Sequence, residues 1–177
     1  NMAKFDYIKE HHSDLNVEGD TRGGDDIISG GAGRDIIYGQ GGDDTIITDI
    51  NTNNGKADGD ILIDGGTGFD TIKLEGNNDI DFSKLGDIIK NIEAIDLTDG
   101  NHKLTNITLD DVLKMSGDNK IKITGDEFDS VIFKDNDGWE LKTENMGKVE
   151  GDKIFDVYTN IGNSTVQVKV EQPISDG

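Results

Sequence analysis

The first feature of the sequence is a nine-residue spacing of apolar and polar positions between Thr21 and Lys73. Each unit has an aspartate at its sixth position and an aliphatic residue at its eighth, and most have glycine at the fourth. One fixed apolar position per unit excludes a helix, because the apolar face of a helix recurs with a period of about 3.6 residues. The pattern predicts a short strand followed by a longer turn, with one side chain of each unit pointing inward.

Five such units can be aligned. They are Thr21 to Ser29, Gly30 to Tyr38, Gly39 to Ile47, Gly55 to Ile63 and Gly65 to Lys73, with Thr48 to Asn54 as an insertion and Asp64 as one extra residue. The eighth positions are Ile28, Ile37, Ile46, Leu62 and Ile72. A single short strand buries too little surface to be stable, so stacked coils of two units each are expected, forming a parallel β-roll.

Residues from Asn77 onward have the composition of an ordinary folded, β-rich protein. The predicted strands are Ala94–Leu97, Lys120–Ile123, Ser130–Phe133, Glu140–Lys142, Ile154–Tyr158 and Thr165–Val170, and the predicted short helices are Ser83–Ile92 and Thr108–Met115. Thr108, with Asp111 three residues later, has the spacing of a helix N-cap. We therefore expect an all-β chain in three parts: a lead-in at 1–18, the β-roll (a β-solenoid) at 19–76, and a capping region at 77–177 that closes the open end of the roll.

Charge narrows the range of partners. The chain has 37 acidic and 17 basic residues, a formal net charge of -20, and no cysteine. The absence of a basic patch argues against nucleic acid and anionic membranes as partners, and no apolar run is long enough to span a bilayer. The first ten residues have no signal-peptide core, so any export is expected to proceed without an N-terminal signal peptide. So many carboxylates must be solvated, paired or neutralised by cations.

The repeat supplies ligands for a hard cation. Glycine permits a positive φ, so the turn can curl with its carbonyl oxygens converging, and the aspartate adds a carboxylate at the end of the turn. Oxygen ligands without nitrogen or sulfur favour calcium. With two units per coil, Asp26 lies beside Asp44, Asp35 faces the turn of Asp60, and Asp44 faces that of Asp70. Carboxylates in coils about 4.8 Å apart repel unless a shared ion lies between them.

These units, written G-G-x-G-x-D-x-U-x with U aliphatic, resemble the RTX (repeats-in-toxin) family of exported bacterial proteins. The resemblance implies a parallel β-roll with calcium (Ca2+) in its turns and export by the type I secretion machinery. It also implies calcium ligands at the first, third, fourth and sixth positions. These are Thr21, Gly30, Gly39 and Gly65; Gly23, Ala32, Gly41 and Thr67; Gly24, Gly33, Gly42 and Gly68; and Asp26, Asp35, Asp44, Asp60 and Asp70.

The second half resembles the C-terminal region of large RTX adhesins through IEAIDL at Ile92, GDEFDSVIF at Gly125 and FDVYT at Phe155. This resemblance implies a secreted, cell-surface, non-enzymatic protein that folds on extracellular calcium, carries its secretion signal in this half and meets a host or surface ligand through its parent adhesin. Two alternatives are a calcium-dependent peptide- or glycan-binding module, and the non-catalytic tail of an exported RTX enzyme or toxin. The serines form no nucleophile elbow, which argues against catalysis.

Two other polar segments have competing interpretations. Asp49, Asn51 and Asn53 begin like an EF-hand loop, but Asn54 stands where the loop requires glycine, so a polar bulge is favoured. Asp135 to Gly138 is interpreted as a turn between strands rather than as an ion site. Trp139 and Tyr158 are expected in the core or cap.

Overall fold

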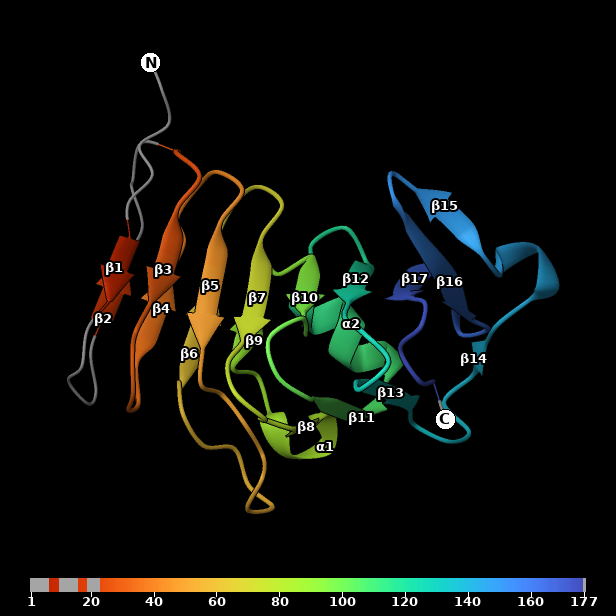
Figure 1. Cartoon of the computed structure of the whole chain (residues 1–177), viewed down its shortest axis with the longest axis horizontal. Coiled ribbons are helices and arrows are strands. Elements are labelled where there is room, and N and C mark those ends of the chain that lie inside the picture. The colour runs from red at the N-terminus through yellow and green to blue at the C-terminus, as the bar shows by residue number, and fades with distance from the viewer. Residues whose placement is uncertain (1–6, 10–15, 19–22, 177) are drawn as a thin grey trace.

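The structure is a computed structural model that describes residues 7–9, 16–18 and 23–176. Most of the predicted lead-in at 1–18, and the predicted ligand Thr21, lie outside the described residues. The chain forms a parallel β-roll that passes into a capping region of strands and two short α-helices (Figure 1). No helix within the described ranges is both long and apolar enough to cross a membrane.

The strands of the roll alternate between two sheets, which confirms that one coil contains two units. One sheet has β1 (Tyr7–Lys9), β3 (Ile27–Ser29), β5 (Thr45–Thr48) and β7 (Thr71–Leu74). The other has β2 (Asn16–Glu18), β4 (Ile36–Tyr38), β6 (Leu62–Asp64) and β9 (Ile89–Lys90). All of these pairs are parallel, and Ile28 lies opposite Ile46.

A column of isoleucines fills the space between the two sheets. Ile28, Ile37, Ile46, Ile63 and Ile72 are each 0% exposed. Full burial of one such side chain contributes about 1.5–3 kcal/mol. The column therefore supplies the apolar stabilisation that the nine-residue pattern predicts.

The alignment of the fourth unit by sequence is wrong by one residue. Ile63, not Leu62, pairs with Ile37 and takes the inward position. The offset between paired strands is 26 residues here and 18 in the preceding coil, so eight extra residues precede Ile63: the seven of the insertion, and one that lies between Asp60 and Ile63. Nine-residue spacing then resumes from Ile63 to Ile72, and Asp64 ends β6 instead of being an extra residue. Both Leu62 and Ile63 are aliphatic, so sequence alone could not distinguish the two registers.

The first sheet continues from the roll into the capping region. Its further strands are β10 (Ala94–Asp96), β12 (Lys120–Thr124), β17 (Asn163–Glu171), β16 (Lys153–Asn160), β14 (Trp139–Glu140) and β15 (Lys148–Glu150). A third sheet has β8 (Ile80–Asp81), β11 (Lys103–Ile107) and β13 (Ser130–Phe133). The pairing is parallel as far as β17 and antiparallel between β17 and β16. The predicted strands are confirmed, except that the one expected at 140–142 is shifted to β14.

One of the two predicted helices is confirmed. Helix α2 (Leu109–Met115) has Thr108 as its N-cap. The Thr108 hydroxyl accepts from the backbone N–H of Asp111, and the Asp111 carboxylate accepts from the backbone N–H of Thr108. The helix expected at 83–92 is wrong beyond its first turn, because α1 (Phe82–Leu85) ends at Gly86, where φ is 69°. Ile89 instead enters β9, where β6 offers a strand to pair with. A 3-10 helix, η1, spans Thr143–Asn145.

Candidate calcium site

The turns that lead into β3, β5 and β7 stack along one edge of the roll, which we call the first edge. The backbone N–H of Asp26 donates to Asp44 Oδ1 at 2.8 Å, and that of Asp44 donates to Asp70 Oδ1 at 2.9 Å. The backbones follow the same stacking, since the N–H of Thr45 donates to the carbonyl of Asp26. The three aspartates therefore form a continuous ladder across successive coils.

Glycines in these turns bring backbone oxygens against the next coil. Gly42 and Gly68 have φ of 116° and 130°, values that other residues rarely adopt. A Cβ on Gly42 would lie well inside 3.0 Å of the Gly24 carbonyl oxygen, and a Cβ on Gly68 would lie even closer to the Gly42 carbonyl oxygen. Each turn thus presents carbonyl oxygens to its neighbour at a separation that only glycine permits.

The carboxylates of the ladder are buried and incompletely bonded. Asp44 and Asp70 are 1% and 0% exposed. Their second oxygens, Oδ2, are buried and have no hydrogen-bond partner. Loss of hydration, and then repulsion by neighbouring carboxylates, raises the pKa of Asp44 to about 6 and that of Asp70 to about 7. Buried carboxylate oxygens without donors are costly, so this edge requires a positive partner.

The ligand set fits calcium. Among the described residues, no group of three or more histidine, cysteine or acidic side chains converges closely enough to hold a metal. The oxygens that this edge offers to an ion are backbone carbonyls of the turns and carboxylates of aspartates from adjacent coils. An all-oxygen shell of six to eight flexible ligands is typical of Ca2+, whereas Mg2+ needs a tighter octahedron and keeps its waters.

The predicted site residues fall on two edges of the roll. On the first edge are Gly23, Gly24, Asp26, Gly39, Gly41, Gly42, Asp44, Gly65, Thr67, Gly68 and Asp70. On the opposite edge, which we call the second edge, are Gly30, Ala32, Gly33, Asp35 and Asp60. The structure brings Asp35 and Asp60 together as expected, since the Asp60 carboxylate accepts from the backbone of Asp35.

The insertion is not an EF-hand loop; it is a hairpin with residues 53–56 exposed, which agrees with the polar bulge on the roll that the sequence favours. Asn51 and Asp58 exchange two backbone hydrogen bonds, at 3.0 and 2.9 Å, so the insertion folds as a hairpin. Ile50 is fully buried within the roll. The carboxylate of Asp49 accepts from the backbones of Gly33 and Asp60, which places it on the second edge. Sequence analysis missed this role because no repeat spacing leads to Asp49.

Sequence analysis also missed Glu93. The backbone N–H of Asp70 donates to Glu93 Oε2 at 2.9 Å, so Glu93 continues the ladder beyond the last repeat. The backbone of Lys122 donates to the Glu93 carbonyl, which puts the buried, apolar Ile121 at the next place. The ladder therefore ends at Glu93. The surrounding sequence has no glycine-rich turn that could have identified this residue.

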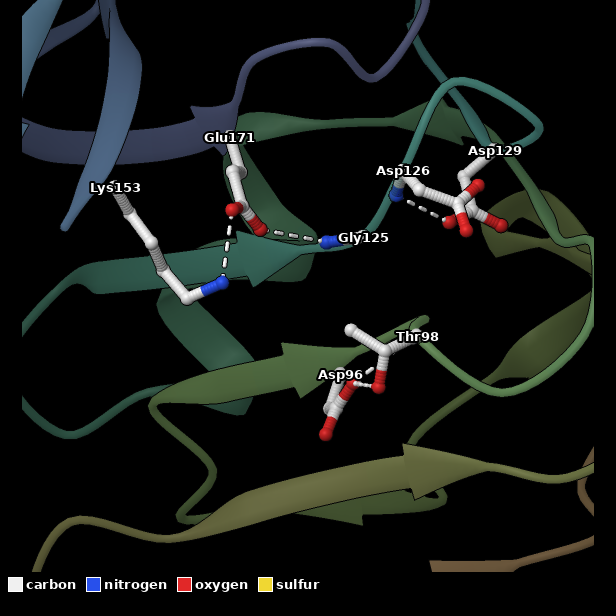
Figure 2. A network of polar contacts seen from close by, with 7 residues as sticks. All are labelled: Asp96, Thr98, Gly125, Asp126, Asp129, Lys153 and Glu171. Atoms are coloured by element: carbon white, nitrogen blue, oxygen red, sulfur yellow. Dashed lines mark hydrogen bonds and ion pairs between the residues drawn. The ribbon is translucent and has the colours of Figure 1, made fainter.

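The degenerate repeat at Gly125 has the same layout as the first-edge turns, but its carboxylate oxygens have hydrogen-bond donors. Asp129 Oδ1 accepts from the backbone N–H of His102 at 2.8 Å. Asp129 Oδ2 accepts from the backbone N–H of Asp126 at 2.9 Å (Figure 2). Glu171 accepts from the Gly125 backbone and pairs with Lys153 at 2.8 Å (Figure 2). Internal donors satisfy this turn, so it differs from the first edge in not requiring a cation.

The turn at 135–138 is likewise held by internal contacts. Asp137 Oδ2 accepts from the backbone of Leu109 at 2.6 Å, and the Asp137 carbonyl accepts from Asn160 Nδ2 at 2.8 Å. The interpretation as a turn between strands agrees with this geometry.

The comparisons with known proteins agree with the geometry of the roll. Residues 20–53 match the family model of the RTX calcium-binding nonapeptide repeat, in 4 copies. No curated protein and no solved structure matched the chain. The chain thus contains an RTX calcium-binding region, its repeats form a β-roll, and its ion is Ca2+.

Proposed function

We propose that calcium binding folds this RTX domain, and that the domain is the C-terminal region of an exported bacterial adhesin. The observation that carries the first part is the first-edge ladder, in which Asp44 and Asp70 each bury a carboxylate oxygen that has no hydrogen-bond partner. Without calcium this edge holds mutually repelling charges. With calcium the same charges become ligands shared by adjacent coils.

The energetic linkage is large enough to control folding. The chain carries a net charge of -20, so self-repulsion opposes compaction wherever calcium is scarce. An extracellular-type site with a Kd of about 0.1–1 mM contributes on the order of 1 kcal/mol or more at millimolar calcium. Several coupled sites then supply a substantial part of a typical net stability of about 5–15 kcal/mol.

A calcium titration followed by circular dichroism tests this linkage. We expect a largely unfolded chain in excess chelator and a cooperative gain of β-structure as calcium rises through the millimolar range. Magnesium at the same ionic strength is the control, and it should give little change. Full native structure in chelator would refute calcium-dependent folding.

The export role follows from the same linkage. A chain that stays unfolded at cytosolic calcium fits a narrow type I secretion channel, and folding outside the cell opposes its return. Secretion of a passenger fused ahead of the whole chain tests this role, with a fusion lacking residues 77–177 as the comparison. Equal export of both fusions would contradict a secretion signal in the second half. We propose a structural and export role for the domain rather than catalysis.

A second candidate function is ligand binding by the capping region. A cavity of about 520 Å³ lies beside Phe133, Trp139 and Tyr158, with Asn136 and Glu140 among its polar lining residues. Aromatic rings beside amide and carboxylate groups suit a glycan or a peptide. Trp139 is the chain's single tryptophan, so its fluorescence reports directly on this cavity. A calcium-dependent change with a glycan or peptide ligand would favour this function.

A further inference from the structure

The second edge of the roll differs from the first because the inserted hairpin reaches it. Asp49, Asp60 and the repeat aspartate Asp35 lie together on this edge: the Asp49 carboxylate accepts from the Asp60 backbone, and the Asp60 carboxylate accepts from the Asp35 backbone. Asp60 is 2% exposed. Its Oδ2 accepts from the Thr48 hydroxyl at 2.6 Å, which fixes the orientation of the carboxylate.

Two oxygens on this edge have no donor. Asp49 Oδ1 and Asp60 Oδ1 are both buried without a hydrogen-bond partner. Over the part of the chain that the structure describes, no lysine or arginine forms an ion pair with either residue. Two desolvated anionic oxygens without a positive partner are strongly unfavourable in a folded protein.

The backbone is shaped to hold Asp49 in this place. Gly59 has φ of 82°, and a Cβ there would lie 2.6 Å from Asp49 Oδ1 and 2.7 Å from the Asp49 carbonyl oxygen. The Asp49 carbonyl is held in turn by the side-chain amides of Asn51 and Asn78, at 3.0 and 3.3 Å. Asn51 and Gly59 of the hairpin, together with Asn78, therefore fix the position of Asp49.

We propose that Asp49 and Asp60 are ligands of a divalent-cation site on the second edge. In this site the inserted segment adds the Asp49 carboxylate to the Asp60 carboxylate of the interrupted repeat. Carboxylate and backbone oxygens select a hard ion, and Ca2+ is the one that the neighbouring repeats bind. This inference rests on the proposed calcium-binding function, because it adds a second kind of site to the same roll.

Calcium stoichiometry by calorimetry on the full chain tests the inference, with Asp49→Asn compared with the wild type. Asparagine keeps the acceptor for the backbones of Gly33 and Asp60 but removes the charge, so the variant is expected to fold. It should lose one bound ion at about 1 mM calcium. Asp58→Asn is the matched control: Asp58 is an exposed aspartate of the same hairpin whose carboxylate accepts from the backbone N–H of Gly59, and its replacement should leave the count unchanged.

Each result has a distinct meaning. An unchanged ion count in Asp49→Asn, or an equal loss in Asp58→Asn, would overturn the second-edge site. No calcium uptake by the wild type would instead overturn the proposed function as a whole. If Asp49→Asn does not fold, anomalous diffraction from wild-type crystals containing terbium decides the matter. A peak between Asp49 and Asp60 supports the site, and peaks on the first edge alone refute it.

Discussion

Replacing Asp44 with asparagine should change stability in opposite directions with and without calcium. Asp44 is the middle of the ladder, accepting from the backbone of Asp26 and donating its own N–H to Asp70. Asparagine retains the shape and one acceptor oxygen but removes the charge. The variant therefore separates the cost of the buried anion from the benefit of binding an ion.

The magnitude can be worked from the environment of Asp44. Burial raises its pKa from 3.8 to about 6, so keeping it ionised at pH 8 costs the calcium-free fold roughly 3 kcal/mol. Asparagine removes that cost and weakens one hydrogen bond, worth about 1 kcal/mol. In chelator the variant should gain about 2 kcal/mol. In calcium, two adjacent sites each worth about 2.7 kcal/mol at a hundredfold excess over Kd are impaired, so the variant should lose about 3 kcal/mol net.

The folded fraction by circular dichroism in chelator, and urea denaturation in 10 mM calcium, measure the two effects; this calcium concentration is about a hundredfold above an assumed Kd of roughly 0.1 mM. Asp43→Asn is the control, since Asp43 is exposed and its carboxylate accepts from the backbone of Phe69 at 2.8 Å. That control should lose less than about 1 kcal/mol in either buffer. An equal loss in both buffers for Asp44→Asn would show that the residue acts only through packing and hydrogen bonds.

Three further predictions test the roll. The buried carboxyl groups have raised pKa values, up to about 7, so the calcium-free fold binds more protons than the unfolded chain. The folded fraction in chelator, measured by circular dichroism, should therefore rise from pH 8 to pH 6, while calcium affinity by calorimetry falls. Gly68→Ala should lower the free energy of unfolding in urea by more than about 2 kcal/mol, because its Cβ would meet the Gly42 carbonyl. Gly55→Ala, with open space around its Cβ, should lower it less, and equal losses would contradict the close stacking. Ile63→Ala should cost about 2–5 kcal/mol and Leu62→Ala clearly less, and the reverse order would restore the register expected from sequence.

The parts of the fold with a repeating pattern could be predicted from the sequence. Nine-residue spacing led to the pairing of Ile28 with Ile46 and of Asp26 with Asp44, because a fixed period leaves one register that buries every isoleucine. The ligand roles of the repeat aspartates and glycines remain predictions. The N-cap of α2 was predictable for a similar reason, since a capping box is local in sequence.

The remaining features depend on tertiary contacts that no local pattern encodes. The apolar residues at 85, 88, 89 and 92 suit a helical face, yet Ile89 pairs in β9 because the exposed edge of β6 is available to it. Asp49 and Glu93 reach the two edges only after the chain has coiled, and neither belongs to a repeat. Short apolar runs are ambiguous between helix and strand until their neighbours in space are known.

The reversal of strand direction at β17 and β16 has a consequence for how such a domain can vary in length. A parallel coil cannot be added beyond an antiparallel hairpin without breaking its pairing, so the side occupied by β16 and β14 is closed to growth. Within the roll, 18 extra residues make one more turn of the spiral and leave every later contact in place. Duplication or deletion of 18-residue segments could therefore change the number of coils, while the terminal antiparallel hairpin stays the same.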